Sequence, residues 1–273
     1  MRNTEFEDCE EFTPEVNMDV LKKCDRQLRR KRHLFANIVS IYQARIPVTH
    51  TLHLPTMIEC DVTCKNMLGV HNSRFLAFLC SLDKRIFSLF LILKQWKKAH
   101  AFPMSTYNLT MLAIYYLQNL PQPILPSIES LKNACPTPVL ENNWVCGFGT
   151  DPIEISNPIG LRALVVGFFR FLPTLDFGVD VICPLLGTTV ERWKFKQPDT
   201  LPPVIRESLC VMPDLPLQTE KPMVVQDPFE LNHNISKGMT HKNLVDLVSI
   251  ASEVAELCEA NPQLPLIGIF LNL

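Results

Sequence analysis

Apolar residues recur at intervals of three and four along four stretches of the chain, a pattern typical of amphipathic helices. Three of these stretches cover residues 105–120, 160–172 and 242–258. The helix at 105–120 is predicted to end before the segment PQPILP, because proline lacks the N–H that a helix requires. The longest stretch begins near Asn72, and its apolar positions are Phe75, Leu76, Leu79, Leu82, Ile86, Leu89, Phe90, Leu93 and Trp96.

Two shorter segments have the composition of strands. ARIPVTHTLH (44–53) and MIECDVTC (57–64) are rich in β-branched residues and are separated by LPT, which predicts adjacent antiparallel strands. Side chains alternate between the two faces of a strand, so Asp61 shares a face with Glu59 and Thr63. Asp61 is therefore predicted to face solvent or a cleft.

The segment VQDPFELNHNI has the features of a helix start. Asp227 stands at the expected N-cap, Pro228 at the first helical position and Glu230 at the third. This interpretation gives both acidic residues a purely structural role.

Charge is unevenly distributed near the N-terminus. Residues 5–19 carry seven acidic side chains, and residues 20–33 then carry seven Lys or Arg. A helix from about Val20 to Phe35 with a solvated basic face is one interpretation. A nuclear-import signal or a patch for RNA phosphates at Arg26 to Arg32 is the alternative, and the sequence leaves the choice open.

Composition narrows the class of protein. The chain has 273 residues, 47% of them hydrophobic, and a net charge of only −2, so nucleic acid would need a local basic patch. No uncharged apolar run reaches the roughly 18 residues of a membrane span. The ten cysteines include no CxxC pair, which favours reduced thiols. We expect a soluble protein of the cytoplasm or nucleus.

Four segments, in order, resemble those of the terminal uridylyltransferases and other noncanonical poly(A) polymerases. They are ARIPV…IECDVTCKNMLGVHN, LILKQWKKAH, STYNLTMLAIYYLQNLPQPILPS and VQDPFELNHN, and together they span Arg45 to His233. The resemblance implies part of a nucleotidyltransferase domain followed by a helical substrate-binding region.

The resemblance also implies a nucleotide site. Asn72 would contact the ribose, Lys94 and Lys98 the triphosphate, and Thr106 the phosphates where the family usually has serine. Tyr107 would stack on the base, with Asp227, Glu230 and His233 at its edge, and His233 would favour uracil. From spacing alone, Lys94 and Lys98 lie one helical turn apart, as surface lysines often do.

This sequence departs most from the family's pattern at the metal site. Its members hold two metal ions with three carboxylates beside a Gly-Ser loop, and these groups act as a unit. Asp61 matches the third carboxylate, whereas Glu5 and Glu7 stand where aspartates are expected. A longer side chain displaces its carboxylate by about 1 Å, which can cost roughly 100-fold in rate. Residues 1–68 contain no glycine, so we expect the catalytic half to be incomplete.

These observations predict a mostly helical α+β fold. Residues 1–66 would form a nucleotidyltransferase remnant with a small antiparallel sheet, and residues 67–273 a helical domain. Three functions stay open. The first is a catalytically inactive binding or adaptor factor in RNA metabolism, which needs no cofactor and has a protein partner or forms a homodimer. The second is an RNA uridylyltransferase with residual or partner-complemented activity, and the third is a UTP sensor. Residual binding of Mg²⁺ or Mn²⁺ and of UTP is part of the second and third hypotheses.

Overall fold

The computed structural model describes residues 14–64, 66–210 and 216–270 of the chain. Contacts between residues divide the chain into two compact units, one ending at Val70 and the other beginning at His71. The sequence prediction placed this division a few residues earlier, at residue 66. Among the described residues, no helix combines the length and hydrophobicity needed to cross a membrane.

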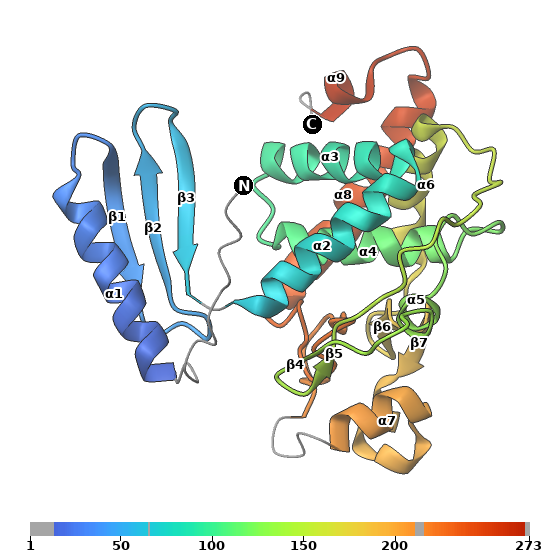
Figure 1. The fold of residues 1–273 in the computed structure, drawn as a ribbon. Helices are drawn as coiled ribbons and strands as arrows, with labels where there is room; N and C mark the ends of the chain where they lie inside the picture. The colour runs from blue at the N-terminus through green and yellow to red at the C-terminus, as the bar shows by residue number, and fades with distance from the viewer. Residues whose placement is uncertain (1–13, 65, 211–215, 271–273) are drawn as a thin grey trace. The chain divides into compact units, whose positions relative to one another are not determined.

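The first unit is a helix against a three-stranded antiparallel sheet (Figure 1). Its strands lie in the order β1-β2-β3, and the predicted strand pair is confirmed by the pairing of β2 with β3. The strand β1 was not predicted. The elements are α1 (Pro14–Arg30), β1 (Phe35–Ile41), β2 (Val48–His53) and β3 (Ile58–Thr63).

The predicted bounds of the first helix are wrong at both ends. It begins at Pro14 and ends at Arg30, and the chain then turns and enters β1 at Phe35. A polar network joins α1 to β1, because the Asp25 carboxylate accepts hydrogen bonds from Arg29 (3.0 Å) and from the Ser40 hydroxyl (2.9 Å). The spacing of apolar residues along the chain does not predict these contacts between α1 and β1.

The second unit is mainly helical. Helix α6 packs against α3, α4 and α8, while short hairpins and 3-10 turns fill the connections (Figure 1). The helices are α2 (Met67–Leu82), α3 (Lys84–Ala99), α4 (Thr106–Gln118), α5 (Ile128–Asn133), α6 (Leu161–Phe171), α7 (Pro203–Cys210), α8 (His241–Ala260) and α9 (Leu266–Phe270). The 3-10 turns are η1 (Leu172–Thr174), η2 (Arg192–Lys196) and η3 (Pro198–Thr200), and the paired strands are β4 (Leu140–Glu141) with β5 (Trp144–Val145), and β6 (Asp180–Cys183) with β7 (Thr188–Glu191).

The long apolar stretch that begins near Asn72 forms two helices rather than one. Asp83 separates α2 from α3 and caps α3, since its carboxylate accepts a hydrogen bond from the backbone N–H of Arg85 (2.7 Å). A further helix, α7, was not predicted. The predicted helices at 105–120, 160–172 and 242–258 are confirmed, and so is the mostly helical α+β class.

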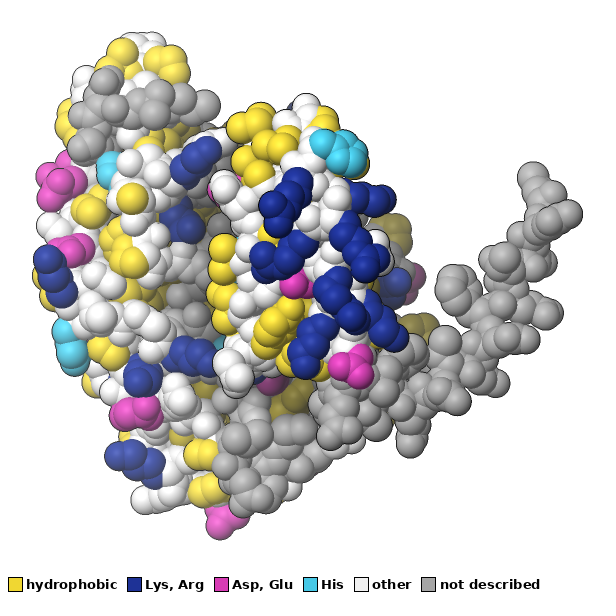
Figure 2. Space-filling view, turned by 90° about the vertical axis from the view of Figure 1, so that its left-hand side faces the viewer, with side chains coloured by type: hydrophobic (Ala, Val, Ile, Leu, Met, Phe, Trp, Pro, Cys, Tyr) yellow, Lys and Arg dark blue, Asp and Glu magenta, His cyan; other side chains and the backbone are white. Residues whose placement is uncertain are grey.

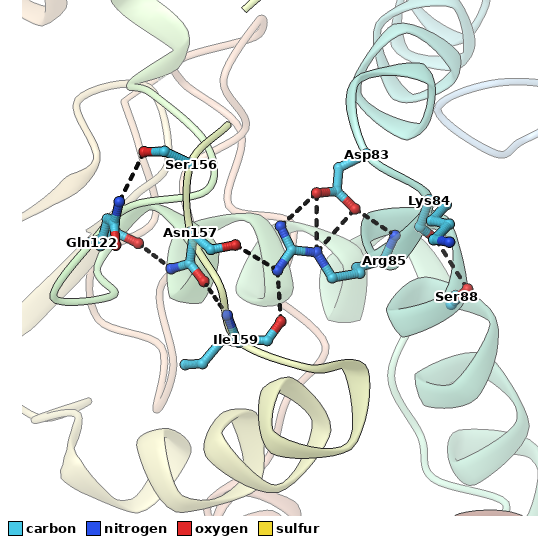
Figure 3. Close-up of polar contacts among 8 residues, drawn as sticks. All are labelled: Asp83, Lys84, Arg85, Ser88, Gln122, Ser156, Asn157 and Ile159. Atoms are coloured by element: carbon cyan, nitrogen blue, oxygen red, sulfur yellow. Dashed lines mark hydrogen bonds and ion pairs between the residues drawn. The ribbon is translucent and has the colours of Figure 1, made fainter. Parts of the chain in front are cut away.

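A largely buried arginine ties the start of α3 to the segment before α6 (Figure 3). The Arg85 guanidinium forms a two-pronged ion pair with Asp83, with one N···O distance of 2.6 Å. It also donates to the backbone carbonyls of Asn157 (2.9 Å) and Ile159 (2.5 Å). Asn157 in turn donates to the carbonyl of Gln122. The network therefore connects three segments that are distant in the sequence.

Candidate functional site

Asp61, the carboxylate expected at a metal site, lies on β3 and is mostly exposed. Residue His50 of β2 is its cross-strand neighbour, and the His50 ring nitrogen Nδ1 bonds to the Asp61 carboxylate. The two side chains line an open cavity of about 200 Å³ together with Asn37 and Glu59. The sequence analysis missed His50, although the register of the two strands places it opposite Asp61.

The donor set for a metal is incomplete in the described part of the chain. No group of three His, Cys, Asp or Glu side chains there could hold an ion, and the Asp61 carboxylate is bonded to His50. The other two expected ligands, Glu5 and Glu7, lie outside the described residues. The described residues thus do not fit a two-metal centre.

The basic run lies on the exposed surface of α1 and the turn after it. Figure 2 looks onto this side of the first unit and shows Lys and Arg side chains gathered there. Asp25 of α1 is buried, whereas Asp19 of the same helix is exposed. The exposed bases are Lys22, Lys23, Arg26, Arg29, Arg30, Lys31 and Arg32. A nuclear-import or phosphate-binding role for this surface stays a prediction.

The segment Asp227–Asn234 is a tight loop, so the predicted helix start at Pro228 is wrong. The Asp227 carboxylate accepts hydrogen bonds from the backbone N–H groups of Phe229 (2.8 Å) and Glu230 (3.0 Å), as a capping residue would. The Asp227 N–H, however, donates to the carbonyl of His233 (3.0 Å), which closes the loop instead of starting a helix. Local capping bonds therefore formed without the helix that they usually accompany.

Four of the predicted nucleotide contacts gather around this loop. The His233 ring lies 3.9 Å from the Glu230 carboxylate. The buried hydroxyl of Tyr107 lies beside Asp227 without reaching hydrogen-bond geometry, and burial raises its pKa well above the ordinary value. Burial likewise raises the pKa of Asp227. The loop thus brings an aromatic ring together with groups that donate and accept hydrogen bonds.

The other candidate contacts come from α2, α3 and the start of α4. The ammonium groups of Lys94 and Lys98 are exposed and have no ion-pair partner among the described residues. Thr106 is exposed at the first turn of α4, which is capped by Ser105 and packs against α3. The side-chain oxygen of Asn72 is buried without a hydrogen-bond partner in the described structure. Exposed lysines and a helix N-terminus both suit phosphate oxygens.

Lys132 of α5 is a second residue that the sequence analysis missed. Its ammonium group donates to the carbonyl of Pro228 (2.6 Å) and lies 4.8 Å from the centre of the Phe229 ring. Burial lowers its pKa to about 8, against the favourable charges of Cys146 and Asp227. Lys132 therefore contacts the Asp227–Asn234 loop at two residues and stabilises it.

The depressed pKa of Lys132 predicts a pH-dependent stability. The folded chain favours the neutral amine, so the Lys132 contribution to stability is fully present above the unfolded pKa of 10.5 and is lost as pH falls through about 8. In urea unfolding, the stability of the unmodified chain relative to Lys132→Met should rise by about 2 to 3 kcal/mol between these pH values. The same comparison with Lys84→Met, an exposed lysine, should stay flat. A flat difference for Lys132 would contradict the buried-lysine interpretation.

Comparison with known proteins supports the predicted resemblance. Residues 3–81 match the family model of the central palm domain of mitochondrial-like poly(A) RNA polymerase. The speckle targeted PIP5K1A-regulated poly(A) polymerase of Xenopus tropicalis is 27% identical over 94% of this chain and 31% of its own length. The mitochondrial poly(A) RNA polymerase of Mus musculus is 27% identical over 81% of this chain and 36% of its own length. The chain spans about a third of the length of these relatives.

Solved structures show the same fold. A crystal structure of mtPAP in complex with CTP aligns with a TM-score of 0.78 and 21% identity, covering 99% of this chain and 58% of the neighbour. A structure of the Cid1 poly(U) polymerase aligns with a TM-score of 0.75 and 19% identity, covering 96% and 78% of the two chains. By sequence this chain is similar to poly(A) polymerases over most of its length, and by fold it resembles the solved structures of mtPAP and of the Cid1 poly(U) polymerase.

Proposed function

We propose that the chain is a nucleotide- and RNA-binding factor that does not transfer the nucleotide by itself. The observation that carries this proposal is the contrast between the two candidate sites. Tyr107, Asp227, Glu230 and His233 gather around one loop, whereas Asp61 is bonded to His50. The neighbouring mtPAP structures hold GTP, ATPγS, UTP and CTP, which supports a nucleotide as the ligand of the first site.

The proposal that the chain does not transfer a nucleotide by itself depends on the carboxylates expected to hold the metal ions. Glutamates at positions 5 and 7 would hold metals less well than the shorter aspartates, and the His50 contact competes with a metal for Asp61. Purified chain with labelled UTP, Mn²⁺ and an RNA oligonucleotide should give no extension. Extension that is abolished in Asp61→Ala would contradict this part of the proposal and would favour residual uridylyl transfer.

Binding of UTP has its own expected result. Ligand at about 100 times its Kd should stabilise the chain by about 2.7 kcal/mol and raise its melting temperature. The shift should disappear in Lys94→Ala, because an exposed ammonium without an ion pair is free to contact the triphosphate. Lys84→Ala, at the other end of α3, should keep the shift. A melting temperature that does not move at millimolar UTP would exclude UTP as the ligand, and with it the UTP-sensor alternative.

An adaptor also needs a partner surface. Three apolar side chains of the β1-β2-β3 sheet and its turns are strongly exposed, namely Val39 (55%), Met57 (69%) and Ile58 (57%). A second copy of the chain or another protein would cover them, which is consistent with the predicted oligomer. Light scattering of the purified chain distinguishes a dimer from a monomer that needs another protein.

A further inference from the structure

A cavity of about 320 Å³ lies beside the 3-10 turn η2, on the second unit. Its walls come from Gly178 and Val179 on one side and from Thr219 and Glu220 on the other, with Trp193 and Lys196 from η2. The volume is at the lower end for ligand pockets and is enough for one nucleotide. None of the nucleotide-site candidates lines it.

Arg192 holds these walls in place. Its guanidinium donates to the carbonyls of Thr219 (2.8 Å), Lys221 (2.7 Å) and Pro222 (3.0 Å), and also to the carbonyl of Phe177. These bonds tie the segment before β6 to the segment at 219–222 across η2. The cavity is thus formed before any ligand enters, which reduces the entropy lost on binding.

The aromatic side chains of η2 point to two different environments. Phe195 packs on a buried cluster of Val181, Leu217 and Val224. Trp193 instead lines the cavity with 46% of its surface exposed. A half-exposed indole in the lining of a cavity can stack against a planar ligand.

The polar groups around Trp193 define the class of ligand. The Lys194 ammonium lies 5.6 Å from the centre of the indole ring and also pairs with Glu191 (3.1 Å). Lys196 has no ion-pair partner among the described residues, so its charge is free for an anion. Glu220 adds a carboxylate that can accept hydrogen bonds from the N–H groups of a base edge. A flat ring, an anion and N–H donors occur together in a nucleotide.

We propose that this cavity binds one nucleotide of a single-stranded RNA, with its base stacked on Trp193 and its phosphate at Lys196. A single strand fits better than a duplex, because a paired base cannot turn its face toward the indole. This inference rests on the proposed function and names the place where the chain would bind RNA. It would hold a part of the strand that the nucleotide loop does not contact.

Fluorescence anisotropy of a labelled ten-nucleotide single-stranded RNA with the full chain tests this site. Trp193→Ala should weaken binding by about 5- to 150-fold, since stacking on one aromatic side chain accounts for about 1 to 3 kcal/mol. Trp193→Phe should retain most of the affinity. Lys196→Ala should reduce the dependence of log K on log salt by about 0.7, the value for one phosphate contact on a single strand. Lys237→Ala, an exposed lysine elsewhere on this unit, is the control.

The outcomes separate this site from the proposed function. RNA binding that is unchanged in Trp193→Ala, with an unchanged melting temperature, would overturn the cavity and leave the proposed function standing. If the unmodified chain does not bind RNA, both the cavity site and the RNA-binding part of the proposed function are contradicted. The melting shift with UTP tests nucleotide binding separately. The proposal would be overturned if the chain bound a proline-rich peptide more tightly than RNA. It would also be overturned if UMP bound as tightly as the oligonucleotide, because the cavity would then hold a different ligand.

Discussion

Replacing Arg85 by alanine should lower the free energy of unfolding by about 3 to 5 kcal/mol. The side chains of Arg85 and Asp83 are only 17% and 14% exposed, so the variant leaves the Asp83 carboxylate buried without its counter-charge. The variant also leaves the backbone carbonyls of Asn157 and Ile159 without this donor. Urea unfolding monitored by circular dichroism measures the loss.

A matched control lies one residue away. Lys84 is exposed on the same first turn of α3, and Lys84→Ala should change stability by less than about 0.5 kcal/mol. Arg85→Lys keeps the charge but not the two-pronged geometry, so its stability should lie between those of the other two variants. Equal stability of Arg85→Ala and Lys84→Ala would mean that the network in Figure 3 contributes little.

The second large effect is expected at Phe75. Its ring is fully buried on α2 and meets the rings of Phe148 (5.2 Å) and Phe229 (5.3 Å) edge to face. Phe75→Ala should cost about 3 to 5 kcal/mol through the cavity that it leaves. Because Phe229 belongs to the Asp227–Asn234 loop, the variant should also reduce the melting shift with UTP.

Phe87 provides the comparison for Phe75. It has the same side chain on the neighbouring helix α3 but is 51% exposed, so Phe87→Ala should cost less than about 1 kcal/mol. The UTP shift should be unchanged in Phe87→Ala. If Phe75→Ala were destabilised but bound UTP normally, the Asp227–Asn234 loop would not depend on this aromatic contact.

Most of the helices could be predicted from local pattern. Three- and four-residue periodicity found α4, α6 and α8, and β-branched alternation found β2 and β3. The missed elements include β1, which has neither a charge nor a proline but is only seven residues long, and α7, which begins at Pro203 and is eight residues long, so neither shows an extended apolar period. Periodicity records only which face of a segment is buried, and it is weakest where a segment is short.

The candidate nucleotide residues were grouped by resemblance, and their role stays a proposal. The structure adds that Tyr107 lies beside the Asp227–Asn234 loop, although the two are far apart in the sequence. It also corrects the local interpretation of Asp227, whose capping bonds close a loop. The same acceptor geometry serves both a helix start and a tight turn, so the local sequence alone could not distinguish them.

The sequence by itself determined the helices α4, α6 and α8, the β2–β3 pair and the resemblance to poly(A) polymerases, because each can be recognised within short segments of the chain. Only the tertiary structure decided which polar groups meet. The Lys132 ammonium reaches the carbonyl of Pro228, 96 residues away, and Arg85 reaches Ile159 across 74 residues. A charge is stabilised or desolvated by whatever packs around it, and contacts at such separations depend on how the helices pack, which no local pattern encodes.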